Sequence, residues 1–112
     1  MRCFCEQKET FDLKMEADVG ADPIWCMECG CNLDLEDIPL SNDLKKELID
    51  WASKYGKWID WDSDKIIPNG IQMEEEHNRQ GEILTESAEQ ELGGKYGITF
   101  SPSTMGGSYK TL

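Results

Sequence analysis

The sequence predicts a small α+β protein, on the basis of three observations. All five cysteines lie near the N-terminus, in the clusters Cys3-Phe4-Cys5 and Cys26–Cys31. Two later stretches repeat apolar residues at helical spacing, and one stretch toward each end of the chain alternates apolar with polar residues. We therefore expect a cysteine-rich N-terminal part, followed by two helices and a short C-terminal strand.

The strands are predicted from period-two alternation. Apolar and charged residues alternate over residues 9–16, which is typical of a half-buried strand. Ile24 and Trp25 precede the second cysteine cluster, and we expect them to form a short pairing strand. Residues 96–100 alternate in the same way. This second strand is a candidate partner for the strand at residues 10–16.

The helices are predicted from apolar stripes and their end signals. Ser41 is a good N-cap, and the first helix is expected over about residues 42–55. Its stripe is formed by Leu44, Leu48, Trp51 and Tyr55. The second helix is expected from about residue 71 to 92, before Gly93-Gly94. Its buried face is expected to contain Met73, His77, Gly81, Leu84, Ala88 and Leu92.

These elements divide the 112 residues into three expected parts. Residues 1–40 form the cysteine-rich segment. Residues 41–104 form the two-helix segment with its terminal strand. From Ser101 the chain is rich in Ser, Pro, Gly and Thr, and residues 105–112 are expected to form a disordered tail.

The spacing of the cysteines predicts a metal site. Cys26-x-x-Cys29-Gly30 brings two thiolates to one tight turn, in which the glycine tolerates a positive φ. Cys3-x-Cys5 offers a second pair, and two pairs satisfy the tetrahedral coordination of Zn²⁺. Two disulfides are the structural alternative. An iron–sulfur cluster or a catalytic dithiol is a further one.

Residues 26–33 resemble the second knuckle of a zinc ribbon, and the resemblance extends over about residues 1–36. It implies a pair of turns held by one metal ion and joined by short strands. Four cysteines leave no open coordination position for catalysis, so the zinc is expected to be structural, with one ion per chain. The ligands are assigned as Cys3, Cys5, Cys26 and Cys29.

Two residues remain as alternative ligands. Cys31 is the spare cysteine in this assignment, and it could replace Cys3. His77 could replace Cys3 or Cys5, although a partly buried, hydrogen-bonded histidine is the default expectation for the one histidine of the chain.

The charge of the chain excludes one common role of zinc ribbons. The formal net charge is −12, and the first 40 residues carry ten carboxylates against Arg2, Lys8 and Lys14. Nucleic-acid affinity rests on cationic side chains, so we expect no direct binding of DNA or RNA. No run of the sequence is long and apolar enough to predict a membrane span or a signal peptide. We expect a cytoplasmic protein that does not bind membranes.

The aromatic residues between the two helices suggest a recognition role. Trp58 and Trp61 lie in a turn-like stretch and are candidates for an exposed patch that binds another protein. The plain alternative is that both cover the corner between the helices. Asp60, Asp62 and Asp64 resemble half of a calcium loop, but the later ligands are missing, so we expect a solvated connector.

A second resemblance concerns residues 44–100. The pattern Trp51…Tyr55…Trp58 followed by Glu76-His77-Asn78…Gly81 is similar to bacterial sequences of no assigned activity. It implies a bacterial, cytoplasmic protein and no particular reaction.

The function expected from these observations is that of an acidic interaction or regulatory module with a structural zinc. The alternative is an acidic nucleic-acid mimic, or an inhibitor of a protein that handles nucleic acid. The sequence shows no phosphate-binding loop, no nucleophile–base pair and no open metal site, so we expect no enzymatic activity.

Overall fold

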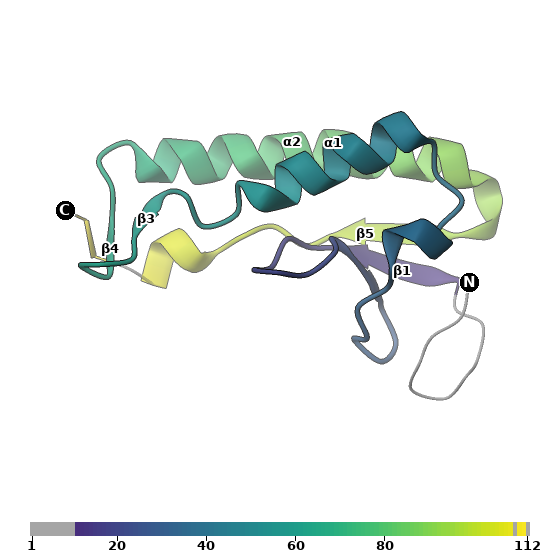
Figure 1. Ribbon diagram of the computed structural model, residues 1–112, viewed down its shortest axis with the longest axis horizontal. Coiled ribbons are helices and arrows are strands. Elements are labelled where there is room, and N and C mark those ends of the chain that lie inside the picture. The colour runs from purple at the N-terminus through teal and green to yellow at the C-terminus, as the bar shows by residue number, and fades with distance from the viewer. Residues whose placement is uncertain (1–10, 109, 112) are drawn as a thin grey trace.

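The structure is a computed structural model that describes residues 11–108, 110 and 111. Two helices lie side by side along one side of a three-stranded sheet, and a second small sheet lies at one end of the helix pair (Figure 1). This architecture confirms the predicted α+β class. The elements in chain order are β1 (Asp12–Met15), β2 (Ile24–Cys26), η1 (Leu35–Asp37), α1 (Asn42–Ser53), β3 (Ile59–Asp60), β4 (Lys65–Ile66), α2 (Gly70–Leu92), η2 (Gly93–Lys95), β5 (Gly97–Phe100), η3 (Met105–Ser108) and β6 (Lys110–Thr111).

The larger sheet has the strand order β2-β1-β5. β1 pairs antiparallel with β2, with Leu13 opposite Cys26, and parallel with β5, with Leu13 opposite Ile98. The predicted pairing of the first strand with residues 96–100 is thereby confirmed. Alternation along β1 places Leu13 and Met15 in the core, where they are 1% and 0% exposed.

One hydrophobic core lies between this sheet and the two helices. Residues before and after the boundary expected at residue 40 contribute to it, so the N-terminal strands and the helices share their buried surface. Its largest members include Leu13, Met15, Ile24, Leu35, Leu48, Trp51, Leu84 and Ile98.

Side chains define the ends of both helices. The Ser41 hydroxyl oxygen accepts a hydrogen bond from the Leu44 N–H at 3.2 Å, which confirms the predicted N-cap of α1. The Ser41 hydroxyl and N–H both donate to the Glu91 carboxylate, at 2.8 and 2.6 Å, and so tie the start of α1 to the end of α2. α1 ends at Ser53, two residues earlier than predicted, because the chain turns through Gly56 at φ +85°.

The two helices approach the sheet closely at Gly81. A Cβ atom at this position would lie 2.4 Å from Cε1 of Phe100 and 2.7 Å from Cζ2 of Trp51. No side chain fits there, so glycine allows α2 to pack directly against an aromatic residue of α1 and one of β5.

The C-terminal segment differs from the disordered tail that the sequence predicts over residues 105–112. Residues 105–108 form η3, and β6 pairs parallel with β4 in the second sheet, whose order is β3-β4-β6. The physical reason lies on α2: the buried Glu74 carboxylate accepts hydrogen bonds from the Ser103 hydroxyl at 2.7 Å and the Gly106 N–H at 2.9 Å. Residues 109 and 112 lie outside the described residues.

Asn78 holds the same segment one helical turn further along α2. Its amide donates to the Ser103 carbonyl at 3.0 Å and accepts from the Ser103 N–H at 2.8 Å. Two neighbouring side chains of α2 therefore bind the chain after β5. In the described part of the chain, no helix has the length and apolar character needed to cross a membrane.

Candidate functional site

The cysteine segment forms a hairpin with its tip at residues 27–30. The Cys26 N–H donates to the Cys31 carbonyl, and the Leu33 N–H donates to the Ile24 carbonyl, both at 2.9 Å. At the tip, the Gly30 N–H donates to the Cys26 carbonyl at 2.9 Å, and Gly30 has the positive φ of +76° expected for this turn. The tight turn with a left-handed glycine, predicted for Cys26–Gly30, is confirmed.

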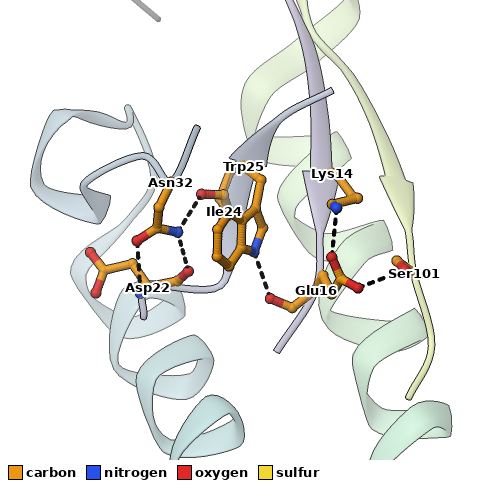
Figure 2. Close-up of polar contacts among 7 residues, drawn as sticks. All are labelled: Lys14, Glu16, Asp22, Ile24, Trp25, Asn32 and Ser101. Carbon is orange, nitrogen blue, oxygen red and sulfur yellow. Dashed lines mark hydrogen bonds and ion pairs between the residues drawn. The ribbon is translucent and has the colours of Figure 1, made fainter. Parts of the chain in front are cut away.

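A polar network fixes the base of this hairpin (Figure 2). The Asn32 amide donates to the carbonyls of Asp22 at 2.6 Å and Ile24 at 3.2 Å, and it accepts from the Asp22 N–H at 3.3 Å. The Trp25 indole donates to the Glu16 carbonyl at 2.8 Å. The hairpin is therefore attached to β1 on one side and to its own return strand on the other.

The predicted zinc ligands are only half described. Cys3 and Cys5 lie outside the described residues. Cys26 is buried at the end of β2, Cys29 is exposed at the hairpin tip, and Cys31 is partly exposed. Among the described residues, no group of three or more His, Cys, Asp or Glu side chains could hold a metal ion. The zinc site stays a prediction that needs the first cysteine pair.

His77 lies on α2 inside an aromatic cluster. Its ring stacks on Trp51 with centroids 4.5 Å apart and lies 5.0 Å from the Trp58 ring. Nε2 of His77 is 3.0 Å from the Trp51 carbonyl oxygen, so Nε2 carries the proton and donates it. Burial lowers the pKa of His77, which favours the neutral ring. The default expectation of a buried, hydrogen-bonded histidine is confirmed.

The two candidate partner-binding tryptophans have different environments. Trp58 is 1% exposed and packs with Ile59 and Ile66 in a small second core, so it does not present its ring to a partner in the free protein. Trp61 is 53% exposed at the β3–β4 turn, and its indole donates to the Gly56 carbonyl at 3.1 Å. Trp58 covers the helix corner, as the plain alternative expected, and Trp61 lies at the surface.

The first of the three aspartates in the β3–β4 turn, Asp60, has a local role. Oδ1 of Asp60 accepts hydrogen bonds from the N–H groups of Asp62 at 3.0 Å and Ser63 at 3.3 Å. This is an Asx turn, which explains the aspartate at this position without a calcium ion.

The outer surface of α2 is strongly acidic. Glu82, Glu86 and Glu89 recur at helical spacing, all are exposed, and we call them the acidic stripe. Between Arg79 and Lys95 the sequence has no basic residue. The stripe lies toward the C-terminal end of α2, where the helix dipole adds negative potential.

An exposed apolar residue lies beside these charges. Ile83 is 57% exposed and directly follows Glu82 in α2. The outer surface of α2 thus combines carboxylates with the apolar side chain of Ile83. Lysine and arginine side chains of a partner complement such a surface, because each joins a cationic head to an aliphatic stem.

Comparison with known proteins identifies the family. Residues 11–103 match the family described as Serratia CdiI immunity protein-like. The chain belongs to this family. The match covers residues 44–100, whose similarity to bacterial sequences was expected, and it extends to β1 and the cysteine hairpin. A search of curated proteins found no match.

The motif between Trp51 and Gly81, which suggested the bacterial resemblance, has a structural role in this fold. Of the residues that carried the bacterial resemblance, Trp51 stacks on His77, Asn78 holds the segment after β5 and Gly81 admits the Trp51 ring, whereas Glu76 is exposed. Sequence reasoning missed Glu74, because it belongs to a run of three glutamates that a helix start explains equally well.

Proposed function

We propose that this chain is an immunity protein that binds a bacterial toxin protein and blocks its activity. The family match over residues 11–103 is the observation that carries this proposal. The protein acts by occupying a surface of its partner and performs no reaction itself. This role combines the two functions expected from the sequence, an interaction module and an acidic inhibitor.

The charge of the described surface supports a basic partner. The chain has a formal net charge of −12, and the acidic stripe offers Glu82, Glu86 and Glu89 on one helix face. Their Cα atoms are separated by about 6 and 4.5 Å along the helix axis. A toxin surface rich in lysine and arginine, such as one that binds nucleic acid, would be attracted to this face and covered by it.

Binding to a purified toxin tests this function. The chain is mixed with each toxin domain carried by its native genome, and the complexes are separated by size-exclusion chromatography with light scattering. We expect one toxin domain to form a stable complex of defined stoichiometry and to lose its activity. If every toxin domain elutes separately and stays active, the chain is not their immunity protein.

We further propose a structural zinc ion at the N-terminal end. The hairpin tip with Cys26, Cys29 and a left-handed Gly30 supports this, because it brings two of the four predicted ligands to one turn. The zinc would hold residues before β1 against the hairpin and has no part in blocking the toxin.

A further inference from the structure

A hollow of about 290 Å³ lies between the end of α1 and the first turns of α2. Its lining includes Trp58, Met73, His77 and Gln80, together with the exposed Lys54. The family match does not assign this hollow, and the acidic stripe lies further along α2.

Two buried side chains of the lining each have an unsatisfied nitrogen. Trp58 is 1% exposed and His77 is 6% exposed. Nε1 of Trp58 and Nδ1 of His77 have no hydrogen-bond partner among the described residues. Buried polar atoms are nearly always paired, so two such atoms in one lining indicate a group that the free protein lacks.

The two nitrogens require opposite partners. An indole N–H can only donate a hydrogen bond. His77 donates from Nε2 to the Trp51 carbonyl, and its neutral ring therefore offers a lone pair at Nδ1. Because the centroids of the Trp58 and His77 rings are 5.0 Å apart and the rings are tilted by 54°, the two side chains are neighbours, and one hydroxyl group could accept from the indole and donate to the imidazole.

The size and walls of the hollow favour an aromatic group that bears this hydroxyl. A cavity of about 150 Å³ holds benzene, so about 290 Å³ accommodates a phenol ring with space at its edges. Met73 packs against the Trp58 cluster and offers a thioether contact to such a ring, and its flexible side chain can adapt to a bound group. The two nitrogens are shielded from solvent in the free protein, so binding requires a local rearrangement of the lining. The exposed Lys54, Lys57 and Glu76 also line the hollow, and the two lysines are cations that are attracted to aromatic faces.

Other side chains fit less well. A carboxylate would attract the lysines and accept from Trp58, but it has no proton for Nδ1 of His77. An aliphatic side chain would leave both nitrogens unpaired. A serine or threonine hydroxyl would satisfy both nitrogens and leave most of the volume empty.

We propose that this hollow binds a tyrosine side chain of the partner protein, with the phenol hydroxyl between Trp58 Nε1 and His77 Nδ1. This inference rests on the proposed function, since it presumes a bound toxin. It places a second contact region on α2, formed by the helix start, the end of α1 and the loop that follows α1.

The test uses p-cresol, the tyrosine side-chain analogue, with toluene and acetate as matched probes. The ¹⁵N-labelled full chain has four tryptophans, and the indole signal of Trp58 is assigned with Trp58→Phe. We expect p-cresol to shift the Trp58 indole signal and the His77 Nδ1 signal saturably at millimolar concentration. The indole signals of Trp25 and Trp61 should stay in place, whereas that of Trp51, which stacks on His77, is not used as a control. Toluene and acetate should bind at least about fivefold more weakly.

Equal binding of toluene and p-cresol, or p-cresol shifts that avoid Trp58 and His77, would overturn the proposal. Trp61→Phe is the matched control variant, because Trp61 is exposed and does not line the hollow, and it should bind p-cresol normally. The comparison of probes on the unaltered protein keeps the test valid even if Trp58→Phe is unstable. If p-cresol binds specifically but no toxin binds, the immunity function is rejected and the phenol-binding hollow is retained. If a toxin binds but p-cresol does not, the tyrosine-binding role of the hollow is rejected and the immunity function is retained.

Discussion

Trp51 and His77 exchange two hydrogen bonds while their rings stack. The Trp51 indole donates to the His77 carbonyl at 2.8 Å, and His77 Nε2 donates to the Trp51 carbonyl at 3.0 Å. The rings are nearly parallel, at 9° and 4.5 Å between centroids. This reciprocal pair joins α1 to α2 in the middle of the fold, and it aligns the elements that carry the acidic stripe and the hollow.

Replacement of His77 by Phe should destabilise the protein and remove a pH effect. The Trp51 carbonyl would lose the His77 donor and keep the Lys54 N–H at 3.1 Å, so the lost hydrogen bond should cost about 0.5–1.5 kcal/mol in the free energy of unfolding at pH 7.5. Urea unfolding measures this, with Gln90→Ala on the exposed side of α2 as the control. A loss no greater than that of the control would contradict the role of the pair.

The pH effect follows from the direction of the His77 shift. Burial lowers the pKa of His77 below its usual 6.5, so the unfolded chain binds this proton more readily than the folded chain. His77 therefore contributes stability that is fully present above about pH 7 and is lost as the pH falls through 6.5 toward the folded pKa. Between pH 7 and 5 the wild type should lose more stability than His77→Phe, and parallel curves for the two proteins would contradict this.

Replacement of Gly81 by Ala should cost about 1–3 kcal/mol through overpacking. The new Cβ would lie 2.4 Å from the Phe100 ring and 2.7 Å from the Trp51 ring, so the helix or both rings must move. Thermal unfolding measures the loss. Gly94→Ala is the matched control, because no heavy atom lies within 4 Å of its Cβ position. Equal melting temperatures for the two variants would show that the close approach is not real.

Replacement of Glu74 by Ala should release the segment after β5. The Ser103 hydroxyl and the Gly106 N–H would lose their common acceptor, and amide exchange over residues 101–108 should rise at least tenfold. Hydrogen–deuterium exchange with mass spectrometry follows this segment. Glu75→Ala, at an exposed position, should leave the exchange unchanged. Unaltered protection in Glu74→Ala would mean that Asn78 and the second sheet hold the segment without it.

Metal analysis under reducing conditions tests the zinc proposal. We expect about one equivalent of zinc per chain, lost in Cys26→Ser and Cys29→Ser and kept in Cys31→Ser. If Cys31→Ser loses zinc and Cys3→Ser keeps it, Cys31 is the ligand in place of Cys3. Metal-free wild-type protein with an ordered N-terminus would reject zinc altogether.

The sequence predicted correctly those parts of the fold that depend on residues close together in the chain. The stripe of Leu44, Leu48 and Trp51 has helical spacing because one face of α1 meets the core, and Ser41 caps that helix with its own side chain. Gly30 follows the same logic, since its left-handed conformation belongs to the turn itself.

Features that depend on distant contacts could not be predicted. Trp58 stands in a short turn, and its burial depends on Ile59, Ile66 and Met73, which the second sheet and α2 bring together. Glu74 looks like its neighbour Glu75 in sequence, and the return of residues 103–106 across α2 distinguishes the two.

Growth of cells that express the toxin tests whether the chain is an immunity protein that binds through the acidic stripe. The cognate toxin domain is induced together with the wild-type chain, with a triple variant of the stripe (Glu82→Lys, Glu86→Lys, Glu89→Lys), or with a matched triple variant at exposed carboxylates elsewhere (Glu28→Lys, Glu36→Lys, Asp37→Lys). We expect the wild type and the matched variant to restore growth and the stripe variant to fail, because its added positive charge repels a basic partner. Arrest of growth despite abundant, folded wild-type chain would contradict the assignment as an immunity protein. Full protection by the stripe variant would contradict the place of the stripe in binding.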